Sequence, residues 1–159
     1  MLQKTISGFY GHDHDDLEVF LKEFQNLKNT HFDSAKESFK KFKFGLQRHI
    51  FWEEMILFPL FEEKTGMKNE GPTAVMRMEH RQIGEALEQL HNKIRQKDTN
   101  SEQEEKCLIS LLSEHNTKEE RIMYPMLDNI SSEEERNGVF ERMERTEEKD
   151  YKTCGCCNH

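Results

Sequence analysis

The chain has 159 residues, a formal net charge of −8, a sequence pI of about 5.5 and only three prolines. This length predicts one domain with a sizeable core, and the acidic balance excludes an electrostatic case for binding nucleic acid. The longest apolar run is far too short to cross a membrane, and residues 1–30 lack the apolar region of a signal peptide. We therefore expect a soluble, cytoplasmic protein that binds neither nucleic acid nor membranes.

Apolar residues at spacings of three and four predict four long helices, over about 13–29, 34–65, 72–97 and 101–129. The expected organisation is a four-helix bundle over residues 1–130, an appended helix over 131–145 and a flexible, cysteine-rich tail over 146–159. No stretch shows sustained two-residue alternation, so we expect no sheet. Short connections between long helices force antiparallel neighbours, and the predicted fold is an all-α, up-down-up-down bundle.

Local signals mark where these helices begin and bend. Three candidate capping boxes, each a serine followed three residues later by a glutamate, predict helix starts at Ser34, Ser101 and Ser132. Pro59 and Pro125 both fall inside helical patterns. Each removes a backbone donor, so each should kink or end its helix.

The chain repeats one arrangement twice. His14 precedes His49 by 35 residues, and His80 precedes His115 by the same distance. Each second histidine opens the phrase His-x3-Glu-Glu-x-Ile-(Leu/Met)-(Phe/Tyr)-Pro-(Leu/Met), and the two copies are offset by 66 residues. The repeat predicts two helical hairpins related by a pseudo-two-fold axis.

In both phrases the histidine and its carboxylate, His49 with Glu53 and His115 with Glu119, lie one turn apart in an apolar stripe. Burying an unpaired carboxylate costs several kcal/mol or more, so it must neutralise, pair or bind a metal. One alternative is that the histidines are ordinary polar residues of a bundle core. The duplicated spacing favours the metal, and four imidazoles with two carboxylates suit iron, manganese or zinc better than calcium.

Six candidates in two-fold arrangement suit two metals rather than one tetrahedral zinc. If each metal takes two histidines and both Glu53 and Glu119 bridge, an oxo or hydroxo bridge brings each metal to five ligands. The sixth position then stays open. An open position on redox iron invites dioxygen, nitric oxide or peroxide.

These residues resemble the hemerythrin-like, or HHE cation-binding, proteins over roughly residues 10–129. The resemblance rests on these motifs: His14, His49-x3-Glu53, Leu57-Phe58-Pro59, Met78-Glu79-His80, His115-x3-Glu119 and Met123-Tyr124-Pro125. It implies a four-helix bundle that holds a non-haem di-iron centre. The implied metal ligands are His14, His49, Glu53, His80, His115 and Glu119.

The chain also departs from the family pattern. Oxygen-carrying hemerythrins have a fifth histidine on the third helix, four residues from its partner, whereas this chain has Met76 and Gly84 there. The four-histidine, two-glutamate set is more similar to bacterial proteins linked to repair of damaged iron centres and to nitric oxide. Those proteins usually carry a cysteine-bearing segment at the amino end, which this chain lacks.

Several residues near the six carry open alternatives. Asp13 and Glu79 either fix an imidazole tautomer or face water. Tyr124 either packs in the core or donates a hydrogen bond into the site. His12 is a candidate fifth nitrogen, but a helix would turn it away from His14.

A second group of residues allows either a structural or a functional role. Glu54 and Glu120 are expected to face solvent or pair with basic residues, and Trp52 to line the pocket or pack. Cys107 stands alone, while Cys154, Cys156 and Cys157 crowd the tail, where they could bind a soft metal, exchange disulfides or simply stay reduced. The pattern is no framework for a secreted disulfide domain.

The expected function is the handling of dioxygen, nitric oxide or peroxide at two iron ions, in iron-centre repair or a stress response. Reversible binding or sensing of oxygen or nitric oxide, and iron storage without turnover, are the alternatives. Turnover would need an electron donor. The sequence leaves open whether the protein is an enzyme, and its oligomeric state.

Overall fold

The computed structural model describes residues 4–152 of the chain. Its helices, in chain order, are α1 (Ile6–Leu27), α2 (Phe32–Trp52), α3 (Phe58–Thr65), α4 (Pro72–Arg95), α5 (Glu102–Lys118), α6 (Tyr124–Ile130), α7 (Glu133–Glu144) and α8 (Glu148–Tyr151). Two π-helical turns, η1 (Glu53–Leu57) and η2 (Glu119–Met123), join α2 to α3 and α5 to α6. Within this part of the chain no residue lies in a strand.

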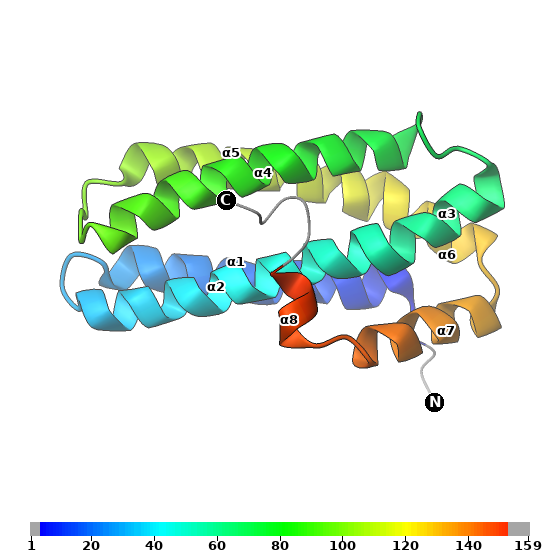
Figure 1. The fold of residues 1–159 in the computed structure, drawn as a ribbon, viewed down its shortest axis with the longest axis horizontal. Coiled ribbons are helices and arrows are strands. Elements are labelled where there is room, and N and C mark those ends of the chain that lie inside the picture. Colours follow the sequence, from blue (N-terminus) through cyan, green and yellow to red (C-terminus); the bar gives the residue numbers. More distant parts are fainter. Residues whose placement is uncertain (1–3, 153–159) are drawn as a thin grey trace.

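The helices form the predicted antiparallel four-helix bundle (Figure 1). One hairpin pairs α1 with α2, and the other pairs α4 with α5. The helix α3 continues α2 and contacts α4, whereas α6 continues α5 and contacts α1. The two hairpins pack against each other along their length. None of the described helices combines the length and apolar character that a membrane crossing requires.

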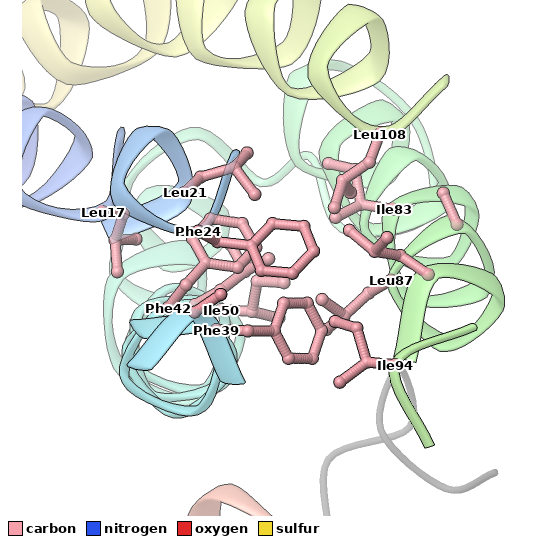
Figure 2. Close-up of a cluster of buried hydrophobic side chains, with 14 residues drawn as sticks. Leu17, Leu21, Phe24, Phe39, Phe42, Ile50, Ile83, Leu87, Ile94 and Leu108 are labelled. Carbon is pink, nitrogen blue, oxygen red and sulfur yellow. The ribbon is translucent and has the colours of Figure 1, made fainter. Parts of the chain in front are cut away.

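Two apolar clusters fill the interior, one towards each end of the bundle. Figure 2 shows the first, in which side chains from α1 and α2 meet side chains from α4. The second joins the start of α1 to η1, α3, η2, α6 and α7. Each of its fully buried aromatic residues, such as Phe58 and Phe61, contributes about 1.5–3 kcal/mol by leaving water. Along α1 and α4 the first histidine of each repeat lies between the two clusters.

The first helix begins at Ile6 and not near residue 13, because two caps hold its start. The Thr5 hydroxyl oxygen accepts the Gly8 N–H at 2.9 Å. The Asp128 carboxylate accepts the N–H groups of Ile6 at 2.7 Å and Ser7 at 3.0 Å. These bonds satisfy donors that a helix start leaves unpaired.

The second repeat fixes the start of its own first helix in a similar way. Glu62 occupies the position equivalent to Asp128, and its Oε2 accepts the hydroxyl of Thr73 at 2.8 Å. Thr73 lies in the first turn of α4. A carboxylate from one hairpin therefore anchors the start of the leading helix in the other.

Only one of the three predicted capping boxes forms. Ser132 caps α7 as predicted. Ser34 lies inside α2, which begins at Phe32, whose ring packs against the first apolar cluster. Ser101 stands at the start of α5, but its hydroxyl donates to the buried Glu105 carboxylate at 2.6 Å and accepts no backbone N–H. Tertiary burial and a competing partner override both local signals.

The two prolines do not end their helices, because a π turn precedes each of them. The chain remains helical past Pro59 to Thr65 and past Pro125 to Ile130. In the wider register the Glu54 carbonyl would receive its bond from residue 59, which as proline has no N–H. Arg77 Nη2 donates to that carbonyl at 3.2 Å.

The region after the bundle is more ordered than the flexible tail predicted from residue 146. Val139, Phe140 and Met143 of α7 belong to the second apolar cluster. The short helix α8 buries Tyr151 against α2, and the Trp52 indole N–H donates to the hydroxyl of Thr146 at 2.9 Å. The predicted cysteine-rich segment, with Cys154, Cys156 and Cys157, lies outside the described residues.

Replacing Asp128 by Ala should lower the free energy of unfolding by about 1 kcal/mol, the usual effect of losing a helix cap. Urea denaturation measures this loss, and hydrogen exchange should localise it to the first turn of α1. Asp128→Asn keeps one carbonyl acceptor, so its free energy of unfolding should fall by less. Equal stability of the Ala variant and the unmodified protein would contradict this role.

Candidate metal centre

The six predicted ligand residues come together in a layer between the two apolar clusters. All six are buried, and Glu53, His80 and Glu119 have no exposed surface. Their donor atoms fall into two overlapping groups, each within 4.8 Å: His80 and His115 with Glu53 and Glu119, and His14 and His49 with Glu119. The spacing predicted this convergence, and the structure brings all six side chains together.

The imidazoles pair within each hairpin. The ring centroids of His14 and His49 are 4.6 Å apart, and those of His80 and His115 are 4.8 Å apart. Glu119 Oε1 lies 3.3 Å from His14 Nε2 and 3.1 Å from His115 Nε2, so it reaches both pairs. Glu53 Oε1 does the same, at 3.4 Å from His49 Nε2 and 3.2 Å from His80 Nε2.

A carboxylate stands behind the Nδ1 atom of every imidazole. The residue before each first histidine backs the second histidine of its own hairpin: Asp13 lies 2.8 Å from His49 Nδ1, and Glu79 lies 2.9 Å from His115 Nδ1. These short bonds decide the open alternative for Asp13 and Glu79. Both hold an imidazole, and both leave its Nε2 directed at the centre.

The residue after each central glutamate backs the first histidine of the opposite hairpin. Glu54 Oε2 lies 3.2 Å from His80 Nδ1, and Glu120 Oε1 lies 3.6 Å from His14 Nδ1. As expected, Glu54 also lies near a basic residue, Arg77, and Glu120 is exposed. The expectation did not include their contacts with the histidines. The repeated Glu-Glu pair carried the signal, because neighbouring helical residues point about 100° apart, one into the bundle and one towards the next helix.

The two repeats hold these outer carboxylates differently. Arg77 lies with its Nη1 3.8 Å from Glu54 Oε1 and its Nη2 3.2 Å from the buried Glu62 Oε1. The equivalent position in the first repeat is Gly11, which has no side chain to restrain Glu120. The surroundings of His80 are therefore more tightly fixed than those of His14.

The negative charges inside the layer raise the affinity of the imidazoles for protons. Burial lowers the pKa of His49, but the negative charge of Glu53 and the hydrogen bond to Asp13 outweigh it and raise the pKa to about 10. Burial likewise opposes charge on His80, yet the adjacent carboxylates of Glu53 and Glu54 raise its pKa to about 9. The same imidazoles hold the pKa of Glu53 well below its usual range despite burial.

Several atoms of the layer lack the partners that buried polar groups require. Among the described residues, His80 Nε2, Glu53 Oε1 and Glu119 Oε2 are buried and form no hydrogen bond. An unsatisfied buried polar group calls for an explanation such as an ion. All three atoms face the same layer, and imidazole with carboxylate is a donor set for transition metals. The residues therefore fit a bound metal.

The two π turns determine which side chains follow the central glutamates into the layer. In an α-helix, residue i+5 points about 140° away from residue i. In η2 the wider turn brings Tyr124 back over Glu119, and the Tyr124 hydroxyl lies 3.0 Å from Glu119 Oε1. Within η2, Ile122 is 55% exposed, whereas Ile56, the equivalent residue of η1, is buried.

Tyr124 therefore belongs to the site, which decides another open alternative. Its hydroxyl also donates to Glu53 Oε2 at 2.8 Å. Burial and the charges of Glu119 and Glu53 raise the pKa of its phenol. Phe58, the equivalent residue of the first repeat, instead stacks on His80 with ring centroids 5.6 Å apart.

The remaining sequence candidates lie away from the layer. The side chain of His12 is 75% exposed and pairs with Asp16, so the helix turns it outward as expected. Trp52 packs in the second apolar cluster. Of the two further histidines within residues 4–152, His31 is exposed and His91 contacts Phe39 and Lys43 away from the layer.

A cavity of about 270 Å³ leads from the layer to the surface. Its inner wall combines the six polar residues with apolar side chains such as Leu21, Leu46 and Ile83. Its exposed lining residues, Glu18 of α1 and Ser113 of α5 among them, place the opening between those two helices. The cavity is near the lower limit for small-molecule sites, which suits a ligand of a few atoms.

Replacing Asp13 by Asn should weaken metal binding about 10- to 100-fold, because loss of a carboxylate behind a ligating histidine typically has that effect. Competition against a chromophoric chelator measures the affinity. Asp16→Asn is the matched control, since Asp16 is exposed on the same helix and its carboxylate pairs with the exposed His12. Equal affinities of both variants would contradict the positioning role.

Removing metal with a chelator should make stability depend on pH above neutrality. The pKa values of His49 and His80 rise from 6.5 to about 10 and about 9. A raised folded-state pKa stabilises the fold fully below about 6.5, and that contribution is lost as the pH rises through 9 to 10. Denaturation midpoints should fall across this window for chelated protein and stay level for metal-loaded protein. Denaturation midpoints that do not change with pH in either form would contradict the raised pKa values of His49 and His80.

Comparisons with known proteins agree with this site. Residues 5–127 match the hemerythrin HHE cation binding domain. An uncharacterised hemerythrin-like protein of Schizosaccharomyces pombe is 29% identical over 143 residues, which are 89% of this chain and 68% of that protein. The iron-sulfur cluster repair protein YtfE of Edwardsiella ictaluri is 49% identical over 43 residues, only 27% of this chain and 20% of that protein. The comparison with solved structures found no significant match. This chain belongs to the hemerythrin HHE cation-binding family, as shown by the family match over most of its length, together with its helical bundle and its buried layer of histidines and glutamates.

Proposed function

We propose that the chain binds two iron ions in the central layer and handles dioxygen, nitric oxide or peroxide there. The proposed ligands are His14 and His49 for one ion and His80 and His115 for the other, with Glu53 and Glu119 bridging. An oxo or hydroxo group is the proposed further bridge. Bound iron would supply redox chemistry and an open coordination position.

The observation that carries this proposal is the pairing of imidazoles with outer carboxylates. Three Nδ1 atoms have a carboxylate within hydrogen-bond distance, from Asp13, Glu54 or Glu79. The fourth, His14 Nδ1, lies 3.6 Å from Glu120 and forms no hydrogen bond. A neutral imidazole held this way keeps its proton on Nδ1 and presents a lone pair at Nε2. Four imidazoles and two carboxylates give a nitrogen-rich donor set, which favours a transition metal over calcium or magnesium.

The cavity supports a small ligand. Its apolar wall limits water near the layer, and its volume of about 270 Å³ leaves room for a ligand of a few atoms. A protected, apolar approach suits molecules that react at a reduced iron centre and would otherwise compete with water. Met76 and Gly84 stand four residues from His80, where oxygen carriers have a fifth histidine, and its absence favours chemistry over reversible oxygen carriage.

The biological setting we propose is repair of damaged iron centres or a stress response. One relative is named an iron-sulfur cluster repair protein, although its match to this chain is short. That role is consistent with a centre that meets nitric oxide or peroxide. Sustained turnover would require an electron donor.

Visible spectroscopy of the iron-loaded protein tests this function. The protein is reduced anaerobically, and dioxygen, nitric oxide or peroxide is then added in separate titrations. We expect rapid oxidation or adduct formation with at least one of the three, at two irons per chain. A stable band that reverses on removing oxygen would instead support a carrier, and no response to any of them would support storage.

Two variants connect that response to the layer. Glu119→Ala should lose iron and stability together, because metal binding and folding are linked. Glu114→Ala changes an exposed residue on the same helix and should keep both. Normal iron content and an unchanged spectrum in Glu119→Ala would rule out the bridging role and with it the proposed centre.

A further inference from the structure

The hydroxyl of Tyr124 lies among four donor atoms of the layer. Its Oη is 2.8 Å from Glu53 Oε2 and 3.0 Å from Glu119 Oε1. It is also 3.2 Å from His49 Nε2 and 3.3 Å from His14 Nε2. The residue is fully buried, so water does not compete for these contacts.

These four distances match those between neighbouring ligands of one metal ion. Metal bonds to nitrogen or oxygen of about 2.0–2.2 Å, set at right angles, place adjacent ligand atoms about 3 Å apart. Tyr124 Oη has four neighbours at that separation. A hydroxyl that merely packed in the core would not have four ligand atoms around it at this spacing.

A hydrogen-bonding role accounts for only part of this arrangement. The phenol has one proton, whereas two carboxylate oxygens and two imidazole nitrogens surround it. Histidines that bind a metal are neutral, and the hydrogen bond between His49 Nδ1 and Asp13 then leaves the lone pair of His49 Nε2 directed at the hydroxyl. One proton cannot satisfy four acceptors, but a cation can bind all of them and the phenol oxygen.

We propose that Tyr124 is a fifth protein ligand of the metal held by His14 and His49, bound through its phenolate oxygen. The proposal rests on the di-iron function above and deepens it, because it makes the two metal positions chemically different. When the bond forms, the O–H bond of Tyr124 breaks, its proton passes to solvent, and no electrons are transferred.

The other metal position has no such ligand. Phe58 takes the equivalent place in the first repeat, and its ring stacks nearly parallel to His80, at an interplanar angle of 13°. The open coordination position of the proposed centre would therefore lie on the ion of His80 and His115. Small ligands would bind at that ion, while Tyr124 fills a position on the other.

Resonance Raman spectroscopy tests this ligand. The protein, loaded with iron and oxidised to iron(III) with ferricyanide, should show a visible phenolate-to-iron charge-transfer band with enhanced tyrosinate ring modes. Tyr124→Phe should abolish both signals while retaining iron. Growth on ring-deuterated tyrosine should shift the modes, which identifies their origin in the unmodified protein even if the variant fails to fold.

Tyr10→Phe is the matched control. Tyr10 is as deeply buried as Tyr124 and packs against it with ring centroids 5.3 Å apart, but its hydroxyl donates to Met143 Sδ at 3.2 Å. The band should survive in this variant. Its loss there, or its persistence in Tyr124→Phe, would assign the signal to another residue and overturn the proposal.

Metal analysis distinguishes the two proposals. Full iron content without tyrosinate modes would show that Tyr124 only donates a hydrogen bond, which overturns the ligand assignment and leaves the di-iron centre standing. Absence of bound iron from the unmodified protein would remove both. Two irons with tyrosinate modes would support both.

Discussion

Two carboxylates with no access to solvent govern the architecture of this bundle. Glu53 and Glu119 lie at the centre with no exposed surface, where an unpaired charge would cost several kcal/mol. Four imidazoles surround them, and a carboxylate backs each imidazole in turn. In the layer, carboxylates therefore alternate with imidazoles, and an apolar cluster encloses it on each side. Its nitrogen and oxygen donor atoms fit cations.

The duplicated sequence builds two halves that are similar but not identical. Both halves insert a π turn at the central glutamate, and π turns within helices frequently occur at functional sites. After that turn one half presents Tyr124 and the other Phe58. Arg77 restrains the outer carboxylate in one half, whereas Gly11 stands at that position in the other. A two-fold framework thus carries two chemically distinct halves of the layer.

Periodicity and spacing predicted the helices, the bundle and the convergence of the six central side chains, because these depend on local patterns repeated along the chain. Contacts between distant segments were not predictable in this way. The start of α1 depends on Asp128, far away in sequence, and α8 on packing against α2. Tyr124 entered the site through a π turn that regular helical geometry does not anticipate. Pro125 indicated where the helix departs from regular geometry, but it did not indicate that Tyr124 would turn into the layer.

The central claim is that six side chains from four helical segments hold a pair of cations. Anomalous diffraction from crystals of the iron-loaded protein tests it most directly. We expect two iron peaks in the layer, one about 2.0–2.2 Å from the Nε2 atoms of His14 and His49 and one equally close to those of His80 and His115. A single peak, or iron bound elsewhere on the chain, would contradict the account.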